Sequence, residues 1–515
     1  MDRFCQFDGS GPAKSDKAST MRFRSGNCRV VDTFPNERNP TLSNRTMSET
    51  LLEQAPAITP PLDSEFRPAW LGNKAFRSAV QKDGGGVPLG LALERENGSV
   101  AVFTTRVLSA AHPQAQANLR YVERIVKFLL WQKGGHRVSI SGPHEVFAHL
   151  QASYAPGGAR AFDADFQRRV YEKPEFVVDR VAEGALPLEF EQPTAVGGHL
   201  DGCRIGFDAG GSDRKVAAVI DGKEVFSCEV VWEPKIQSDA EYHFQGIDDS
   251  IRRAAEHLPR IDAIGVSSAG IYVNNRTMVA SLFRKVPEEQ FNARIKSIYT
   301  DIAKKWGDVP IEVANDGDVT ALAGALELKD QPVLGIAMGT SQAVGYVNPQ
   351  GLITGWLNEL AFAPIDYSHS APVDAEWSGD VGTGVNYFSQ DAVIRLAPRA
   401  GITLTATASP GAKLKEVQEL VKQGHAGARA IFETIGVYLG YGLLHYADFY
   451  ALKHVLLLGR VTSGEGGNLI VERARAVLQA EDADLAARVQ LHLPDESQRR
   501  VGQAIAAASL PRRRS

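Results

Sequence analysis

Strand-like and helix-like spacings of hydrophobic residues alternate along residues 66–195. The segment 86–108 is typical of two strands joined by a turn. The segment 114–135 has apolar residues at the spacing of one helix face and ends in two glycines. A strand over 137–143 and a helix over 144–154 follow. Residues 66–195 are therefore predicted to form an α/β module, and the pattern alone assigns it no function.

Residues 1–65 lack this periodicity. They are rich in Ser, Pro, Asn, Asp and Arg, and the stretch 55–63 contains two adjacent prolines that exclude a helix. A segment of this composition buries too little apolar surface to fold alone, so we predict that it is largely disordered. It contains no continuous apolar run of signal-peptide length.

From residue 203 to about residue 510, strand and helix patterns alternate again. Residues 203–232 show the short apolar stretches and glycine turns of a strand meander. Helical spacing is found at 318–328 and 427–451, and 454–459 is typical of a buried strand. This larger region is therefore also of the α/β class.

The amino-acid composition excludes several classes of protein. The 515-residue chain is 43% hydrophobic and 23% charged, which is typical of a packed globular protein. Its formal net charge of -5 argues against a general nucleic-acid binder, and no apolar run reaches the roughly 20 residues of a membrane helix. Four cysteines without close spacing exclude a disulfide scaffold and a cysteine-rich zinc site. We expect a cytoplasmic protein that binds neither membrane nor nucleic acid.

The turn 208-DAGGS-212 is a candidate phosphate site. Gly210 and Gly211 allow positive φ and a close backbone approach, and their N–H groups can form an anion nest. Ser212 adds a hydroxyl, and Asp208 is placed to hold Mg²⁺ directly or through water. An ordinary hairpin turn is an equally good interpretation of this motif alone.

Two further glycine motifs offer similar groups. A second turn between apolar strands contains Gly339, Thr340 and Ser341, although on its own a structural turn is favoured. A loop after the buried strand at 454–459 contains Gly459, Gly464 and Gly466. A glycine-rich loop after a strand is typical of nucleotide sites in α/β sheets, but this one matches neither a P-loop nor a dinucleotide fingerprint.

The motif 315-NDGD-318 places Asp316 at the end of a predicted strand and just before a helix. The positive end of a helix dipole favours an ionised carboxylate there, which suits a general base. The alternative is that Asp316 and Asp318 only cap the helix, with Asp318 as the N-cap residue.

The order of these motifs resembles the actin-like ATPase and sugar-kinase superfamily and, more narrowly, the ROK family of repressors, open reading frames and sugar kinases. The resemblance covers about residues 203–510. The segments that carry it are 205–219, 264–272, 313–327, 335–347, 456–467 and 501–510.

This resemblance implies two ribonuclease H-like lobes, at 203–325 and 326–510, which close over ATP and a sugar. Asp316 would be the catalytic base, Asn315 a ligand of a sugar hydroxyl, and Asp208 the Mg²⁺ site. Phosphates would be bound by Gly210, Gly211, Ser212, Gly339, Thr340 and Ser341, and adenosine by Gly459, Gly464 and Gly466. The family also implies a homodimer or homotetramer.

The chain departs from the ROK pattern in the sugar motif. Glu359 matches the sugar-binding glutamate, but the histidine expected after it is missing. No cysteine follows Cys228, so no family zinc site is expected. Arg460 replaces the second glycine of the adenosine motif, and Trp356 is a candidate for stacking on a sugar ring.

The favoured interpretation is an ATP-dependent kinase that phosphorylates a hexose or hexosamine. A ROK-type sugar-responsive transcriptional regulator is an alternative, although residues 66–195 lack a clear helix-turn-helix pair with a basic recognition helix. A catalytically silent sugar or nucleotide sensor is the third interpretation, since the zinc loop is lost.

Overall fold

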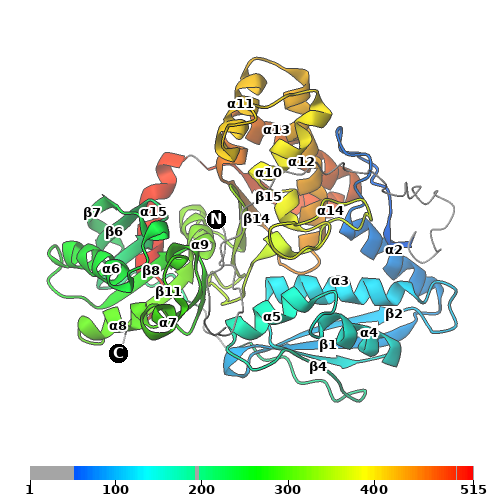
Figure 1. The fold of residues 1–515 in the computed structure, drawn as a ribbon, viewed down its shortest axis with the longest axis horizontal. Coiled ribbons are helices and arrows are strands. Elements are labelled where there is room, and N and C mark those ends of the chain that lie inside the picture. Colours follow the sequence, from blue (N-terminus) through cyan, green and yellow to red (C-terminus); the bar gives the residue numbers. More distant parts are fainter. Residues whose placement is uncertain (1–50, 192–195, 495, 514–515) are drawn as a thin grey trace, which may run out of the picture.

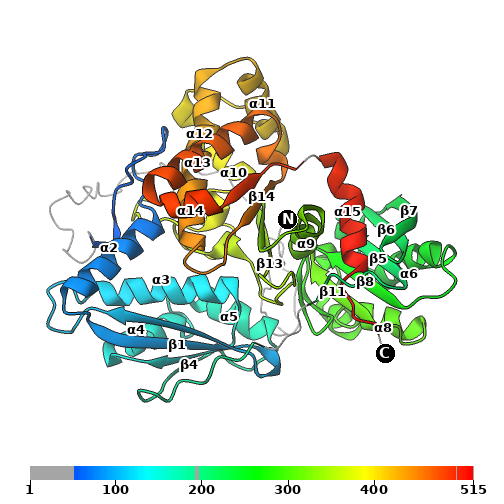
Figure 2. The ribbon, with the colours of Figure 1, turned by 180° about the vertical axis from the view of Figure 1, so that it is seen from behind.

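The computed structural model describes residues 51–191, 196–494 and 496–513 (Figures 1 and 2). Residues 1–50 of the segment predicted to be disordered lie outside the described residues. Residues 51–65 pack against the rest of the molecule: Leu52 is fully buried, and Asp63 accepts a hydrogen bond from the Tyr438 hydroxyl. This stretch is ordered by contacts with residues far away in the sequence, such as Tyr438, so its composition alone could not predict that it is folded. None of the described helices is long and apolar enough to cross a membrane.

The N-terminal module contains a four-stranded sheet of order β2-β1-β3-β4. Its strands are β1 (Val87–Glu94), β2 (Val100–Val107), β3 (Arg137–Ser141) and β4 (Val177–Arg180), and its helices are α2 (Ala69–Lys82), α3 (Ala117–Gln132), α4 (His144–Tyr154) and α5 (Ala161–Val170). The strands and helices predicted from 86 to 154 are thus confirmed. Figure 1 shows α2 and α3 between this sheet and the rest of the molecule, so α3 is buried on nearly all sides.

A five-stranded sheet of order β11-β8-β5-β6-β7 follows in the chain. Its strands are β5 (Cys203–Ala209), β6 (Asp213–Ile220), β7 (Lys223–Val231), β8 (Ala263–Ser268) and β11 (Ile311–Asn315). Strands β11, β8 and β5 are parallel, and β6 and β7 continue the sheet as antiparallel hairpins. Helices α6 (Ala240–Ala255) and α8 (Ile298–Lys305) cover one face. A small hairpin, β9 (Ile271–Val273) and β10 (Arg276–Val279), and the short helix α7 (Glu288–Gln290) complete this region.

The opposite face of the five-stranded sheet is covered by the C-terminal helix α15 (Glu496–Ala508) (Figure 1). Gly206 and Gly265 permit this contact, because a Cβ atom there would lie 1.9 Å from the Ala504 carbonyl oxygen and 1.6 Å from that of Ala507. The helix predicted near 501–510 therefore exists, but it packs on the sheet formed by residues 203–315 and not on the sheet of the region 326–510 to which the sequence assigned it.

The remaining sheet has the order β13-β12-β14-β15. Its strands are β12 (Val333–Met338), β13 (Gln342–Val347), β14 (His454–Leu458) and β15 (Gln490–His492), and its helices are α10 (Gln390–Leu396), α11 (Pro410–Lys422), α12 (Ala426–Tyr446), α13 (Glu465–Glu481) and α14 (Ala483–Arg488).

Helix α9 (Asp316–Leu328) begins directly after β11 and packs against β12, β13 and α15. It therefore links the two sheets.

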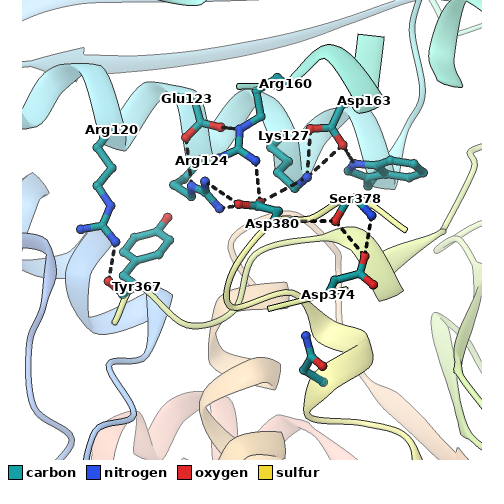
Figure 3. A network of polar contacts seen from close by, with 12 residues as sticks. Arg120, Glu123, Arg124, Lys127, Arg160, Asp163, Tyr367, Asp374, Ser378 and Asp380 are labelled. Atoms are coloured by element: carbon teal, nitrogen blue, oxygen red, sulfur yellow. Dashed lines mark hydrogen bonds and ion pairs between the residues drawn. The ribbon is translucent and has the colours of Figure 1, made fainter. Parts of the chain in front are cut away.

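Buried charges join the N-terminal module to the loop between β13 and α10 (Figure 3). The group comprises Arg124, Lys127, Arg160, Glu123, Asp163 and Asp380. Asp380 accepts hydrogen bonds from Arg124 at 2.8 and 3.2 Å and lies 2.8 Å from Arg160 Nη1 and 3.3 Å from Lys127 Nζ. Burial alone would raise the pKa of Asp380, but these cations hold it far below its usual range. The three cations are matched by three carboxylates, and this pairing offsets the free-energy cost of removing so many charges from water.

Candidate active site

Asp316 is the first residue of α9, directly after β11 ends at Asn315. Asn315 is the N-cap residue, because its Oδ1 accepts a hydrogen bond from the Gly317 N–H at 2.8 Å. The prediction that Asp318 caps this helix is wrong. The Asp318 carboxylate is buried and accepts hydrogen bonds from the backbone N–H of Tyr346 at 2.9 Å and from the side chain of Asn358 at 3.1 Å. The Asp316 carboxylate also accepts a hydrogen bond from the Gly317 N–H, at 3.0 Å.

The Asp316 side chain is half-buried and lines a cavity of ≈ 330 Å³, together with Lys215 and Gly459. Burial and the neighbouring negative charge of Asp208 raise the pKa of Asp316 to about 6. A carboxylate with this pKa is mostly ionised at neutral pH, yet it is more basic than an ordinary aspartate. It can therefore accept a proton from a hydroxyl group in the cavity.

Asp208 lies directly opposite Lys215 in the register of β5 and β6, so their side chains share one face of the sheet. Asp208 is buried, and its Oδ1 accepts a hydrogen bond from the Ser267 hydroxyl at 2.8 Å. Burial raises the pKa of Asp208, although Ser267 and Lys215 oppose this shift. Sequence reasoning missed Lys215, which brings positive charge to the cavity; its signal was the hairpin register that pairs it with Asp208.

The first glycine turn contributes less to the cavity than predicted. Gly210, Gly211 and Ser212, all within the described chain, do not line this cavity, and neither glycine has a positive φ. Gly210 is instead required by a close approach, since a Cβ atom would lie 2.6 Å from the Asp213 carbonyl oxygen. The Ser212 hydroxyl donates to the Asp213 carboxylate at 3.0 Å and is exposed, so it can still reach a ligand that enters from solvent.

The second glycine turn lies beside the late glycine loop. Gly459 has a φ of 93°, and a Cβ atom there would lie 2.4 Å from the Met338 carbonyl oxygen. Arg460, the departure from the family motif, donates a hydrogen bond to the Thr340 hydroxyl at 2.9 Å. Gly339 precedes this threonine in the turn.

Gly464 and Gly466 have separate roles in the late glycine loop. Gly464 has a φ of 68° and stands next to open space, just before α13. Gly466 is buried against the Phe432 ring, since a Cβ atom there would lie 2.7 Å from two ring carbons. Gly466 therefore serves packing in this structure, while Gly464 remains accessible to a ligand.

Thr340 and Ser341 line a second cavity, of ≈ 100 Å³, together with Glu359. Burial and the negative charges of Asp316 and Asp318 raise the pKa of Glu359 to about 7. The electrostatic coupling shows that Glu359 lies near Asp316, although Asp316 does not line this cavity. Asp316 therefore lines the first cavity and lies close enough to Glu359 in the second for their negative charges to interact.

Asn315 and Trp356 line a third cavity, of ≈ 160 Å³, and not the cavity that contains Glu359. The Asn315 side-chain amide donates a hydrogen bond to the Gly270 carbonyl oxygen at 2.8 Å. Trp356 stacks on Tyr346 with ring centroids 5.6 Å apart. Of the tryptophans, Trp377 lines the cavity of Glu359 instead. Sequence spacing could not distinguish these two tryptophans, because both stand in irregular loops.

Metal ligands are sparse in the described part of the chain. It contains no group of three or more His, Cys, Asp and Glu side chains positioned to hold a metal ion. Asp208 and Asp316 are two neighbouring carboxylates, which suit a hard ion that also binds water and phosphate oxygens.

No protein-family model and no curated protein sequence matches the chain. Solved structures that match it include a ROK hexokinase from Thermus thermophilus, with 18% identity, coverage of 59% of this chain and 96% of that chain, and a TM-score of 0.46. A ROK family glucokinase from Streptomyces griseus in complex with glucose and AMPPNP has 20% identity, coverage of 60% and 98%, and a TM-score of 0.44. A ROK family transcriptional regulator, a homologue of the E. coli MLC protein, has 15% identity, coverage of 60% and 78%, and a TM-score of 0.49.

Proposed function

We propose that this chain is an ATP-dependent sugar kinase of ROK type, which phosphorylates a hydroxyl group of a hexose or hexosamine. The observation that carries the proposal is the position of Asp316. Its half-buried carboxylate, with a pKa of about 6, lines one polar cavity and is electrostatically coupled to Glu359 in the next. In this proposal, the sheets of β5 and β12 are the centres of two ribonuclease H-like lobes.

The cavity shared by Asp316, Lys215 and Gly459 would receive the terminal phosphates of ATP. Lys215 supplies a positive charge there, and the nearby Asp208 carboxylate supplies a hard oxygen for Mg²⁺, directly or through water. The exposed turn at Gly211 and Ser212 and the half-buried turn at Thr340 and Ser341 offer further N–H and hydroxyl donors to phosphate oxygens.

The cavity lined by Glu359 would receive the sugar. In the reaction, a sugar hydroxyl oxygen attacks the γ-phosphorus and Asp316 takes the hydroxyl proton. A new oxygen–phosphorus bond forms as the bond between the γ-phosphorus and the bridging oxygen breaks, and ADP leaves with the bonding electrons. Phosphoryl transfer depends mainly on positioning and charge neutralisation, which these side chains and Mg²⁺ would supply together.

The test is ADP formation from ATP and Mg²⁺ with a panel of neutral and amino hexoses, combined with identification of the sugar phosphate. The Asp316→Asn variant removes the base while it preserves the shape of the side chain. It is expected to lose at least about 100-fold in kcat, since a general base contributes 10²–10⁴-fold, with ATP affinity changed little. Wild-type turnover by Asp316→Asn, or no sugar-dependent ADP formation by the unaltered protein, would refute the proposal.

A further inference from the structure

The cavity that contains Glu359 is lined by apolar side chains, by the hydroxyl groups of Ser281, Thr340 and Ser341, and by several hydrogen-bond acceptors. Three carboxylates, those of Glu359, Glu376 and Asp391, contribute to its wall. Among the described residues that line it, none is Lys, Arg or His. Glu376 and Asp391 are exposed to solvent at this cavity. Partial burial and the negative charge of Glu376 raise the pKa of Asp391, so the two carboxylates interact electrostatically.

Gln390 adds an acceptor that is independent of the carboxylates. Its side chain lines the same cavity and is only 4% exposed, and its Oε1 atom has no hydrogen-bond partner within the described chain. A buried amide oxygen without a partner is costly, so such an atom indicates a ligand that donates a hydrogen bond. The cavity thus combines one amide oxygen that lacks a hydrogen-bond donor with negatively charged carboxylates.

The loop that carries Glu376 and Trp377 is closed and anchored at its base. The Asp374 N–H donates to the Asp380 carbonyl oxygen at 2.8 Å, and the Ser378 hydroxyl donates to the Asp374 carboxylate at 2.7 Å. The Asp380 carboxylate in turn lies within the buried charges of the N-terminal module (Figure 3). The module therefore anchors the base of the loop that carries Glu376 and Trp377, and an anchored loop loses less entropy when a ligand binds.

We propose, on the basis of the kinase function above, that the sugar acceptor carries a free ammonium group. Glu376, Asp391 and the Gln390 side-chain oxygen would surround this group. An ammonium group offers three donors and one positive charge to a wall of acceptors. The indole of Trp377 lines the same cavity and favours a cation further. A neutral hexose offers no charge, and N-acetylation leaves one N–H donor and no charge.

The experiment is calorimetric titration of the full chain, without nucleotide, at about pH 6.5, where the amine is protonated. The probes are D-glucosamine and D-mannosamine, with D-glucose, D-mannose and N-acetyl-D-glucosamine for comparison. At least one amino hexose is expected to bind about tenfold more tightly than its neutral parent, which corresponds to about 1.4 kcal/mol. Equal or weaker binding of both amino hexoses, or no binding of any probe, would overturn the inference.

Variants identify the groups responsible. The double variant Glu376→Gln with Asp391→Asn is expected to reduce the preference to less than about twofold, because it removes charge and retains size. Glu289→Gln, on the exposed helix α7, is the matched control and is expected to keep the preference. Full preference in the double variant would also overturn the inference.

The results separate this inference from the kinase proposal. Selective binding of an amino hexose without ADP formation would refute only the kinase proposal. Turnover of neutral hexoses with no preference for the amine would refute only the inference of an ammonium site.

Discussion

Replacement of Asp380 by asparagine removes the only negative charge that Arg124, Lys127 and Arg160 share within the described chain. Arg124 and Arg160 would keep Glu123 as a partner and Lys127 would keep Asp163, but three cations would then face two carboxylates. The Asp380 side chain is 5% exposed and that of Lys127 is 0% exposed, so water cannot compensate the excess positive charge. Removal of one partner from a buried ion pair typically costs about 3–5 kcal/mol. We expect Asp380→Asn to lower the free energy of unfolding by about that amount, as measured by urea denaturation at neutral pH.

The matched control is Asp179→Asn on the same module. Asp179 pairs with Arg137 at 2.8 Å, but both side chains are 37% exposed, so the expected loss is at most about 1 kcal/mol. The double variant Arg124→Gln with Asp380→Asn restores the charge balance and is expected to lose less than the sum of its single changes. Equal losses for Asp380→Asn and Asp179→Asn would refute the view that these buried charges hold the module in place.

Two further predictions concern the base and the C-terminal helix. Because Asp316 must be ionised to accept a proton and its pKa is about 6, kcat/KM is expected to fall about tenfold per pH unit below that value; a flat profile between about pH 5 and 7 would contradict this role. Gly265→Ala is expected to destabilise the protein by at least about 1–3 kcal/mol in thermal or urea unfolding, since its Cβ atom would lie 1.6 Å from the Ala507 carbonyl oxygen of α15. Gly502→Ala, in the same helix and with its nearest neighbour at 3.7 Å, is the control and is expected to be neutral or stabilising.

Local sequence patterns determined the elements that carry the candidate site. The period of hydrophobic residues placed β11 and α9 next to each other, and this junction alone puts Asp316 at the start of a helix. The alternation in β5 and β6 around a glycine turn likewise fixed the hairpin that pairs Asp208 with Lys215. These features depend on residues a few positions apart, so they can be read from the sequence.

Tertiary structure alone decided what surrounds Asp316 and Glu359. Asp318 lost its predicted capping role because Tyr346 and Asn358 satisfy its carboxylate from other segments. Gln390 lines the cavity of Glu359 from the first residue of α10, and Trp377 lines it from an irregular loop. The base of that loop is held by charges more than 200 residues earlier in the chain, among them the Arg124 guanidinium that binds Asp380. Such contacts leave no local period in the sequence, because burial and charge pairing between distant segments depend on the packed fold and not on neighbouring residues.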